Sequence, residues 1–213
     1  MSIIRPACAV LVAATLLLTG CSRAITGTAV TAAGSAPGSP GGGSGQCATV
    51  TAPLTDIPAR NSREPQLRIP TPAGWERNTI MDNQVIRFAI VAQGLVANRF
   101  APNAVVTLGS VRGTQDPGVV FTQNRRNLTA MMGAFDLHTE SNTTCGFPSE
   151  TTTYTAPPLG PAPRRPVIMH AVVVQIASST YLATLTVQTT EPQNPTYVHD
   201  SEEIVDGFQI RLP

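Results

Sequence analysis

Apolar residues occupy both sets of alternate positions across residues 167–174, where the sequence is VIMHAVVV and only His170 is polar. A run of this kind is typical of a strand that is covered on both faces. Residues 181–187 show a similar β-rich pattern, and residues 177–180 between the two runs are predicted to form a short hairpin loop. The pattern therefore predicts an antiparallel pair whose first strand is buried.

Shorter apolar, β-rich runs predict further strands along the chain. The first of them stops at residues 70–74, a Pro-Thr-Pro-Ala-Gly turn built from residues with fixed or permissive φ angles. These predicted strands cover residues 66–69, 85–92, 104–111, 147–155 and 208–212.

Two segments have helical patterns. The first is predicted to begin at Asp116-Pro117, because Asp caps free backbone amides and Pro suits the first helical position, and to end at Gly133. Its predicted inner face carries Val120, Leu128 and Met131. The second covers residues 197–206, and its predicted inner face consists of Val198, Ser201, Ile204 and Val205.

Strands in meander order, interrupted by two helices, predict an α+β fold in which helices pack on an antiparallel sheet. Residues 47–213, which contain all of these elements, have the length of a single domain.

The first twenty residues have the pattern of an export signal. Arg5 supplies a positive charge, and the apolar run at residues 7–18 is shorter than the roughly 20 residues of a membrane-spanning helix. The run ends in Leu18-Thr19-Gly20-Cys21, which resembles the lipobox of bacterial lipoproteins. The alternatives are an ordinary signal peptide or a buried apolar segment that contains Cys. We interpret residues 1–20 as a lipoprotein signal peptide and Cys21 as the lipidation site.

The segment after Cys21 has the composition of a flexible linker. Of residues 22–46, 21 are Gly, Ala, Ser, Thr or Pro, which bury too little apolar surface to stay ordered. A flexible chain of this length has an end-to-end distance on the order of 25–30 Å. Residues 21–46 are therefore predicted to hold the domain near a membrane without fixing its orientation.

The near-zero net charge of the chain argues against nucleic-acid binding and against electrostatic attachment to a membrane. The chain has 14 Arg, no Lys and 13 acidic residues, and removal of residues 1–20 leaves 13 Arg against 13 acids. A binder of nucleic acid needs a basic surplus, which this chain lacks. A neutral protein is not held at a membrane by charge, so the predicted anchor consists of acyl chains on Cys21.

Cysteine usage predicts one disulfide. Cys8 leaves with the signal peptide and Cys21 is lipidated, which leaves Cys47 and Cys145 in an exported domain. A redox or metal pair is the alternative, but the sequence has no C-x-x-C and no His cluster near either residue. We therefore predict a Cys47–Cys145 bridge.

Four segments of the sequence resemble the mycobacterial LpqN/LpqT lipoprotein family in their order and spacing. They are RIPTPAGW at residues 68–75, CGFPS at 145–149, YLATLTV at 181–187 and the closing D-x-E-x-I-x-x-G-F pattern at 200–208. The resemblance covers residues 64–210 and implies a PsbP-like α-β-α sandwich, a curved antiparallel sheet flanked by two main helices, in a cell-envelope lipoprotein. Cys145 departs from the family pattern, where a small polar residue is expected, so the disulfide is expected to mark a subgroup.

Catalytic chemistry is not indicated. The sequence contains no G-x-S-x-G, H-E-x-x-H, P-loop or G-x-G-x-x-G motif. Its three histidines, His138, His170 and His199, are dispersed. A Ser-His-Asp site could in principle include His170, but nothing in the sequence spacing favours it. A hydrogen-bonded structural role for this mid-strand histidine is the simpler interpretation. We predict no enzyme activity, no catalytic or metal-binding residues and no cofactor.

Three further groups have a structural and a functional interpretation. Trp75 either packs at the sheet edge or lines a ligand pocket. Met131-Met132 with Phe135 belongs either to the core, which we favour, or to an apolar groove for acyl chains. The Arg pairs at 125–126 and 164–165 are either exposed solubilising residues, the default, or a site for an anionic headgroup.

Two functions from different classes remain. The first is a non-enzymatic module that binds an amphipathic envelope lipid or glycolipid, on the extracytoplasmic face of the cell membrane. The second is a protein-interaction module, either an accessory subunit of an envelope transport system or a surface antigen that contacts host proteins. A lipid binder needs an apolar cavity of several hundred Å³, whereas an adaptor needs an exposed patch or sheet edge. Hydrolase activity is a distant third.

Overall fold

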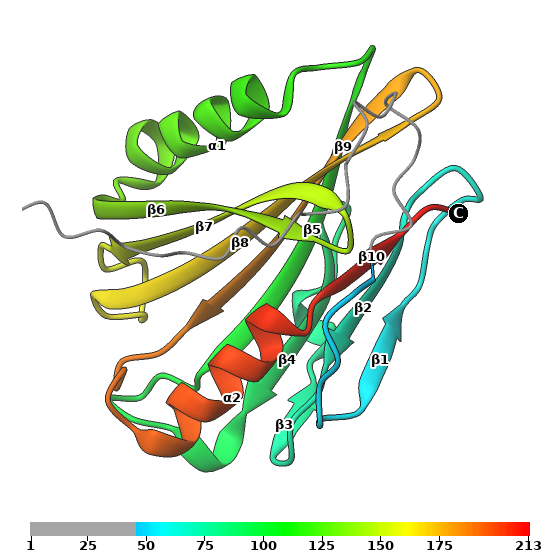
Figure 1. Cartoon of the computed structure of the whole chain (residues 1–213). Helices are drawn as coiled ribbons and strands as arrows, with labels where there is room; N and C mark the ends of the chain where they lie inside the picture. The colour runs from blue at the N-terminus through cyan, green and yellow to red at the C-terminus, as the bar shows by residue number, and fades with distance from the viewer. Residues whose placement is uncertain (1–45) are drawn as a thin grey trace, which may run out of the picture. The chain divides into compact units, whose positions relative to one another are not determined.

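A computed structural model describes residues 46–213, which form two antiparallel sheets and two α-helices (Figure 1). The strands are β1 (Leu54–Ile57), β2 (Gln66–Pro70), β3 (Trp75–Arg77), β4 (Ile86–Ala92), β5 (Asn103–Arg112), β6 (Phe135–Thr144), β7 (Phe147–Ala156), β8 (Arg165–Ile176), β9 (Ser179–Gln188) and β10 (Gln209–Arg211). The helices are α1 (Pro117–Met132) and α2 (Pro195–Asp206), with short 3-10 turns η1 (Thr79–Met81) and η2 (Gln93–Leu95).

The large sheet has the strand order β3-β4-β5-β9-β8-β7-β6, and every neighbouring pair in it is antiparallel. The small sheet has the order β1-β2-β10, so the last strand of the chain pairs with the second. β8 and β9 lie in the middle of the large sheet, which explains why they are the most apolar strands.

The two faces of the large sheet are covered by different elements (Figure 1). On one face α2 and the small sheet enclose the main core, which includes Ile69, Val106, Leu185, Ile204 and Phe208. On the other face α1 packs on β7 and β8 and contributes only two buried side chains, Phe121 and Leu128. Successive apolar side chains of β8 point to opposite faces of the sheet and are buried on both, as expected for a strand covered on both sides.

The α+β fold predicted from the pattern is confirmed, with helices on an antiparallel sheet. The predicted strands and both helices are present with small shifts of their ends; α2 begins at Pro195. Three strands were not predicted, namely β1, β3 and β6.

The predicted inner faces of the helices are wrong at two positions. Met131 was placed on the inner face of α1, but its side chain is 80% exposed. Val198 was placed on the inner face of α2 and is 37% exposed, while Tyr197 beside it is buried. Leu128 on α1 and Ser201, Ile204 and Val205 on α2 are buried as predicted. An aromatic residue that was not predicted there, Phe121 or Tyr197, completes each inner face.

The predictions for the signal peptide, for Cys21 and for the linker lie outside the described residues. Between residues 46 and 213, no helix combines the length and the apolar character needed to span a membrane.

Candidate functional site

The helix α1 forms one wall of a groove because it covers only part of its face of the sheet. Asp116 caps the helix by accepting a hydrogen bond from the Val119 amide at 3.1 Å, and Gly133 ends it with a φ of 65°. Its packing partners are β7 and β8, so the neighbouring strands β9 and β5 are left beside it. The groove lies between α1 and these two strands.

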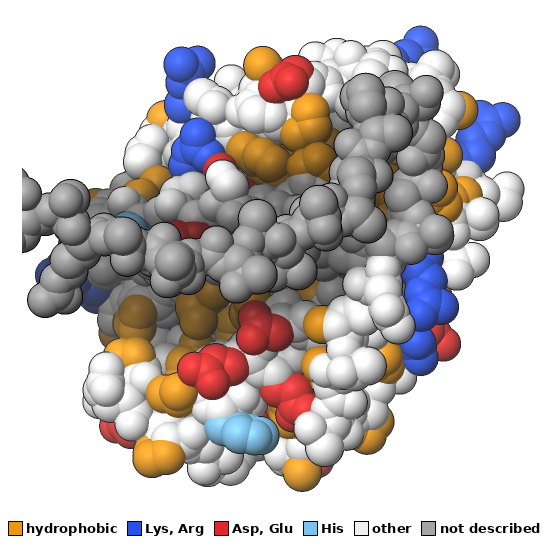
Figure 2. Space-filling model, in the orientation of Figure 1, with side chains coloured by type: hydrophobic (Ala, Val, Ile, Leu, Met, Phe, Trp, Pro, Cys, Tyr) orange, Lys and Arg blue, Asp and Glu red, His pale blue; other side chains and the backbone are white. Residues whose placement is uncertain are grey.

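This α1 groove has a volume of about 580 Å³, and none of the described residues that line it is charged. Its apolar side chains are Val111 of β5, Val119 and Val120 of α1 and Leu182 of β9. Figure 2 shows hydrophobic side chains gathered in the hollow between α1 and β9. The polar part consists mainly of side-chain amides, from Gln115, Gln123, Asn124 and Asn127.

The amide groups of the α1 groove have hydrogen-bonding capacity to spare. Gln123 donates to Asn127 Oδ1 at 2.9 Å, and Asn124 donates to the sulfur of Met169 at 3.6 Å. Each amide group offers two donor hydrogens and an oxygen acceptor, so these bonds use only part of the set. An apolar floor beside neutral donors and acceptors suits a ligand that carries an alkyl chain and hydroxyl groups.

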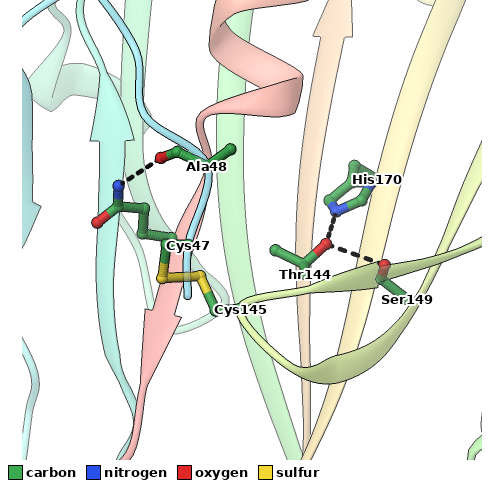
Figure 3. Close-up of a disulfide and its surroundings, with 7 residues drawn as sticks. Cys47, Ala48, Thr144, Cys145, Ser149 and His170 are labelled. Carbon is green, nitrogen blue, oxygen red and sulfur yellow. Dashed lines mark hydrogen bonds between the residues drawn. A yellow bond between two sulfur atoms is a disulfide. The ribbon is translucent and has the colours of Figure 1, made fainter. Parts of the chain in front are cut away.

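A second feature lies on the opposite face, where the chain enters the domain. Cys47 and Cys145 are joined by a disulfide (Figure 3). Cys145 and Gly146 form the two-residue turn of the β6–β7 hairpin, with φ angles of 51° and 84°. Positive φ at both central residues is the requirement of a tight hairpin turn. The bridge therefore joins the entry of the chain to a hairpin tip.

Residues 46–52, here called the strap, are held by several contacts besides the disulfide. Gln209 of β10 donates to the Ala48 carbonyl at 3.2 Å (Figure 3), and the amides of Thr51 and Ala52 donate to Glu203 of α2. The hydrogen bond from the Ala52 amide is the main reason that the pKa of Glu203 lies below its ordinary value. The strap is thus fixed to β10, to α2 and to the hairpin.

His170 occupies a hydrogen-bonded chain rather than a catalytic arrangement. Thr144 donates to Ser149, so its proton is engaged, and His170 Nε2 must be the donor to Thr144 at 2.7 Å (Figure 3). Nδ1 is then the acceptor from Thr151 at 2.9 Å. Burial lowers the pKa of His170 to about 4, so the ring is neutral at pH 7.

The other two histidines lie elsewhere on the surface. His138 on β6 is 3.5 Å from Glu140, and His199 on α2 is 3.3 Å from Asp200, and both side chains are about three-quarters exposed. The structure does not bring the three histidines together. Within residues 46–213, no set of three or more His, Cys, Asp or Glu side chains is placed to hold a metal ion.

Trp75 is buried, as one of its interpretations predicted, whereas Met131 and Met132 are exposed. Trp75 lies on the edge strand β3, and its indole N–H donates to Asp200 at 2.8 Å. Met131 and Met132 are 80% and 57% exposed, so their preferred placement in the core is wrong. Neither methionine lines the α1 groove.

The predicted exposure of the Arg pairs is wrong for Arg165 and only partly met by Arg125, whose side chain is 32% exposed. Arg165 is 9% exposed; its Nε donates to Gln188 and its guanidinium lies 5.0 Å from the Phe100 ring centre. Arg125 forms an ion pair with the buried carboxylate of Glu150. Arg126 and Arg164 are exposed. Both inward-facing arginines therefore have structural partners.

Sequence reasoning did not find the α1 groove. Its residues come from β5, from α1 and the loop before it and from β9, and none of these segments carries a motif of its own. The signal that was present is the amide-rich outer stripe of α1, at Gln123, Asn124 and Asn127.

Comparison with known proteins adds a family relationship. A family model described as "probable lipoprotein LpqN" matches residues 51–211. Among solved structures, the chain is similar to LpqN of Mycobacterium tuberculosis, described as involved in cell envelope biogenesis. That match has a TM-score of 0.60 and 17% identity, and covers 75% of this chain and 91% of the other. At this identity the likeness shows the fold.

Two more distant structures are also similar. The Ran-binding protein Mog1p of Saccharomyces cerevisiae matches with a TM-score of 0.45 and 12% identity, over 75% of this chain and 96% of the other. A Pseudomonas aeruginosa protein of unknown function matches with a TM-score of 0.41 and 13% identity, over 70% and 94%. At these scores neither match supports an argument. No curated protein sequence matches the chain.

Proposed function

Because this chain belongs to the LpqN family of probable lipoproteins, we propose that it is a non-enzymatic, membrane-anchored binding module of the cell envelope. Its ligand is an uncharged amphipathic lipid, a glycolipid being the best fit, and the α1 groove is where that ligand binds. The proposal includes the PsbP-like sandwich, since each face of the large sheet carries one helix.

The observation that carries this proposal is the chemistry of the α1 groove. Its described lining combines four aliphatic side chains with four side-chain amides and contains no charged residue. Ligand sites are mostly apolar, with a few polar groups that fix orientation. Amides bind sugar hydroxyls without the desolvation cost of a buried charge. A neutral glycolipid matches both parts of the groove.

The proposed location depends on Cys21. Acyl chains on this residue anchor the protein at the extracytoplasmic face of the membrane, and the linker lets the domain reach lipids within about 25–30 Å. The substitution Cys21→Ala is expected to move the protein from the membrane fraction to the soluble fraction. Retention of the variant in the membrane fraction would show that the anchor lies elsewhere.

The absence of catalysis is part of the same proposal. His170 is neutral and both of its ring nitrogens are engaged with threonine hydroxyls, so it is not available as a general base. Turnover of generic esters by the purified protein, with loss of activity in His170→Ala, would contradict this part.

Native mass spectrometry of the protein purified from an envelope-containing host tests ligand binding. The wild type is expected to carry a lipid or glycolipid. Val120→Glu places a carboxylate in the α1 groove and is expected to lose the ligand, while Val198→Glu, on the exposed face of α2, is the matched control and should retain it. A ligand-free wild type, or a ligand retained by Val120→Glu, would overturn the proposal.

A protein-interaction module is the second candidate, and one loop favours it. Ile80 is 93% exposed and Val85 is 61% exposed, on either side of a turn that Asn83 stabilises by accepting bonds from two backbone amides. Exposed apolar side chains on an ordered loop are typical of contact surfaces. A ligand-free mass combined with a crosslinked envelope protein that is lost in Ile80→Asp would favour this function.

A further inference from the structure

A second groove lies beside the strap, on the side of the small sheet that faces away from the core. Its volume is about 660 Å³, and it is bounded by the strap, by β2 and β10 and by the β6–β7 hairpin tip. On this side Arg68 of β2 stands directly opposite Gln209 of β10 in the sheet register. We call it the strap groove.

The strap groove is charged, in contrast to the α1 groove. Arg68 and Arg211 both line it. Asp56 lies 2.8 Å from Arg68 Nε, but its side chain is 84% exposed and it is not among the lining residues. No carboxylate is found among the described residues of the lining. The groove therefore presents two guanidinium groups, which favour an anion.

Two buried polar atoms of strap-groove residues make no hydrogen bond among the described residues, Arg68 Nε and Gln209 Oε1. Arg68 Nε has Asp56 as an ion-pair partner at 2.8 Å, whereas Gln209 Oε1 has no partner of this kind within residues 46–213. Gln209 is 5% exposed, its nitrogen donates to the Ala48 carbonyl, and its oxygen Oε1 is buried without a hydrogen bond among the described residues. The nitrogen bond fixes which end of the amide is the oxygen. A buried acceptor without a donor is costly, so its position in a ligand groove calls for a ligand donor.

The rest of the strap groove is largely apolar. Val50, Leu54, Phe147 and Leu212 belong to its lining, and Leu212 is 42% exposed. These side chains provide a surface for an alkyl chain next to the two arginines and the Gln209 oxygen. All three parts of the lining lie within one groove.

We propose that the strap groove binds an anionic amphiphile. Its phosphate or carboxylate pairs with Arg68 and Arg211, a neighbouring hydroxyl or ammonium group donates to Gln209 Oε1, and its alkyl chain lies along the apolar residues. This site is separate from the α1 groove, so it does not depend on the function proposed above.

Calorimetric titration with monolauroyl lysophosphatidylglycerol, below its critical micelle concentration, tests this site. The probe has an anionic phosphate, glycerol hydroxyls and one alkyl chain. The protein is the full chain with Cys21→Ala, produced in an oxidising host so that no acyl anchor competes and the disulfide forms. Monolauroyl lysophosphatidylcholine has no net charge and no donor in its headgroup beyond the single glycerol hydroxyl, and glycerol 3-phosphate lacks the chain. Each is expected to bind at least about tenfold more weakly.

Substitutions in the lining assign the binding to this groove. Arg68→Gln and Gln209→Met are each expected to weaken the affinity for lysophosphatidylglycerol by about tenfold. Arg126→Gln removes an exposed arginine from α1 and is the control for net charge. Gln209→Met removes the unpaired acceptor and also the bond to the Ala48 carbonyl, two changes with opposite effects on the melting temperature.

Three outcomes would overturn the proposal. They are the absence of binding by lysophosphatidylglycerol, binding that neither Arg68→Gln nor Gln209→Met weakens, and binding that Val120→Glu abolishes while Arg68→Gln leaves it intact. The last result would place the anionic ligand in the α1 groove. Equal affinity for glycerol 3-phosphate would show a site for a free phosphate rather than for a lipid.

Discussion

The two faces of the large sheet are built differently. The face under α2 and the small sheet is closed by a continuous core in which Phe208, Ile204 and Ile210 are almost completely buried, and the disulfide and the strap reinforce it. The face under α1 has two small apolar clusters, and α1 buries only Phe121 and Leu128. One face supplies stability and the other leaves surface free.

This difference shows how a small domain combines stability with an open site. Most of the free energy of folding comes from buried apolar area, and that area is concentrated on the α2 face. The α1 face can therefore keep exposed aliphatic and amide side chains without loss of the fold. Four predictions test this division, in order of expected effect.

Removal of the disulfide should weaken the α2 face most. The bridge closes a loop with a sequence separation of 98, for which the chain-entropy model gives about 4–5 kcal/mol. Urea denaturation of Cys47→Ser/Cys145→Ser should show a lower free energy of unfolding by about that amount. The folded variant should still retain a ligand in the α1 groove, and a loss of less than about 1 kcal/mol would contradict the structural role of the bridge.

Truncation of one phenylalanine on each face compares the two cores directly. Phe208→Ala, at a side chain that is 1% exposed, should lower the free energy of unfolding by about 3–5 kcal/mol. Phe121→Ala, at 7% exposed on α1, should cost about 2–3 kcal/mol, because fewer atoms surround it. Chemical denaturation measures both values, and equal losses would remove the proposed difference between the faces.

The burial of His170, which lowers the pKa of its ring, should make stability depend on pH. Its pKa is about 4 in the folded protein and 6.5 in the unfolded chain, so the unfolded chain binds the proton more readily. This contribution is fully present above pH 6.5 and is lost as pH falls towards 4, by about 3 kcal/mol. Denaturation at several pH values should show this slope, and His170→Gln should flatten it.

Removal of the helix caps should produce the smallest effects. Asp116 caps α1 and Asn194 caps α2 through bonds to backbone amides, and each substitution by Ala should cost about 1 kcal/mol. Hydrogen exchange should show a further difference. Asp116→Ala should increase exchange mainly in α1, whereas Asn194→Ala should affect α2 together with the strands packed on it. Identical patterns would indicate that α1 is as firmly attached as α2.

The sequence predicted the strongly apolar elements and the capped helices. β8 and β9 were predicted because they lie in the middle of the sheet, where burial on both faces leaves a continuous apolar run. The edge strand β6 was not predicted, since most of its ten residues are at least partly exposed and polar, so its sequence FDLHTESNTT has no apolar alternation. β1 and β3 are too short, at four and three residues, to show a period.

The exposure of Met131 on α1 and the burial of Arg165 depend on contacts between segments that are distant in the sequence. Arg165 is buried because Gln188 and Phe100 lie around it, and no local pattern relates these three positions. Met131 was assigned to the core on spacing alone, but α1 packs mainly on β7 and β8, and the Met131 side chain points away from them and is 80% exposed. Neither groove could be predicted from a local pattern either, because each lining joins segments that are far apart in the chain.

The position of the Cys47–Cys145 bridge also determines how the domain responds to mechanical force. A pull on the chain from the amino-terminal side of residue 47 reaches the disulfide before the rest of the strap. The load then passes into the β6–β7 hairpin through a covalent bond, so the contacts of Ala48, Thr51 and Ala52 are not broken one after another. Reduction of the bridge would convert this attachment into one that peels at low force, which single-molecule stretching would detect.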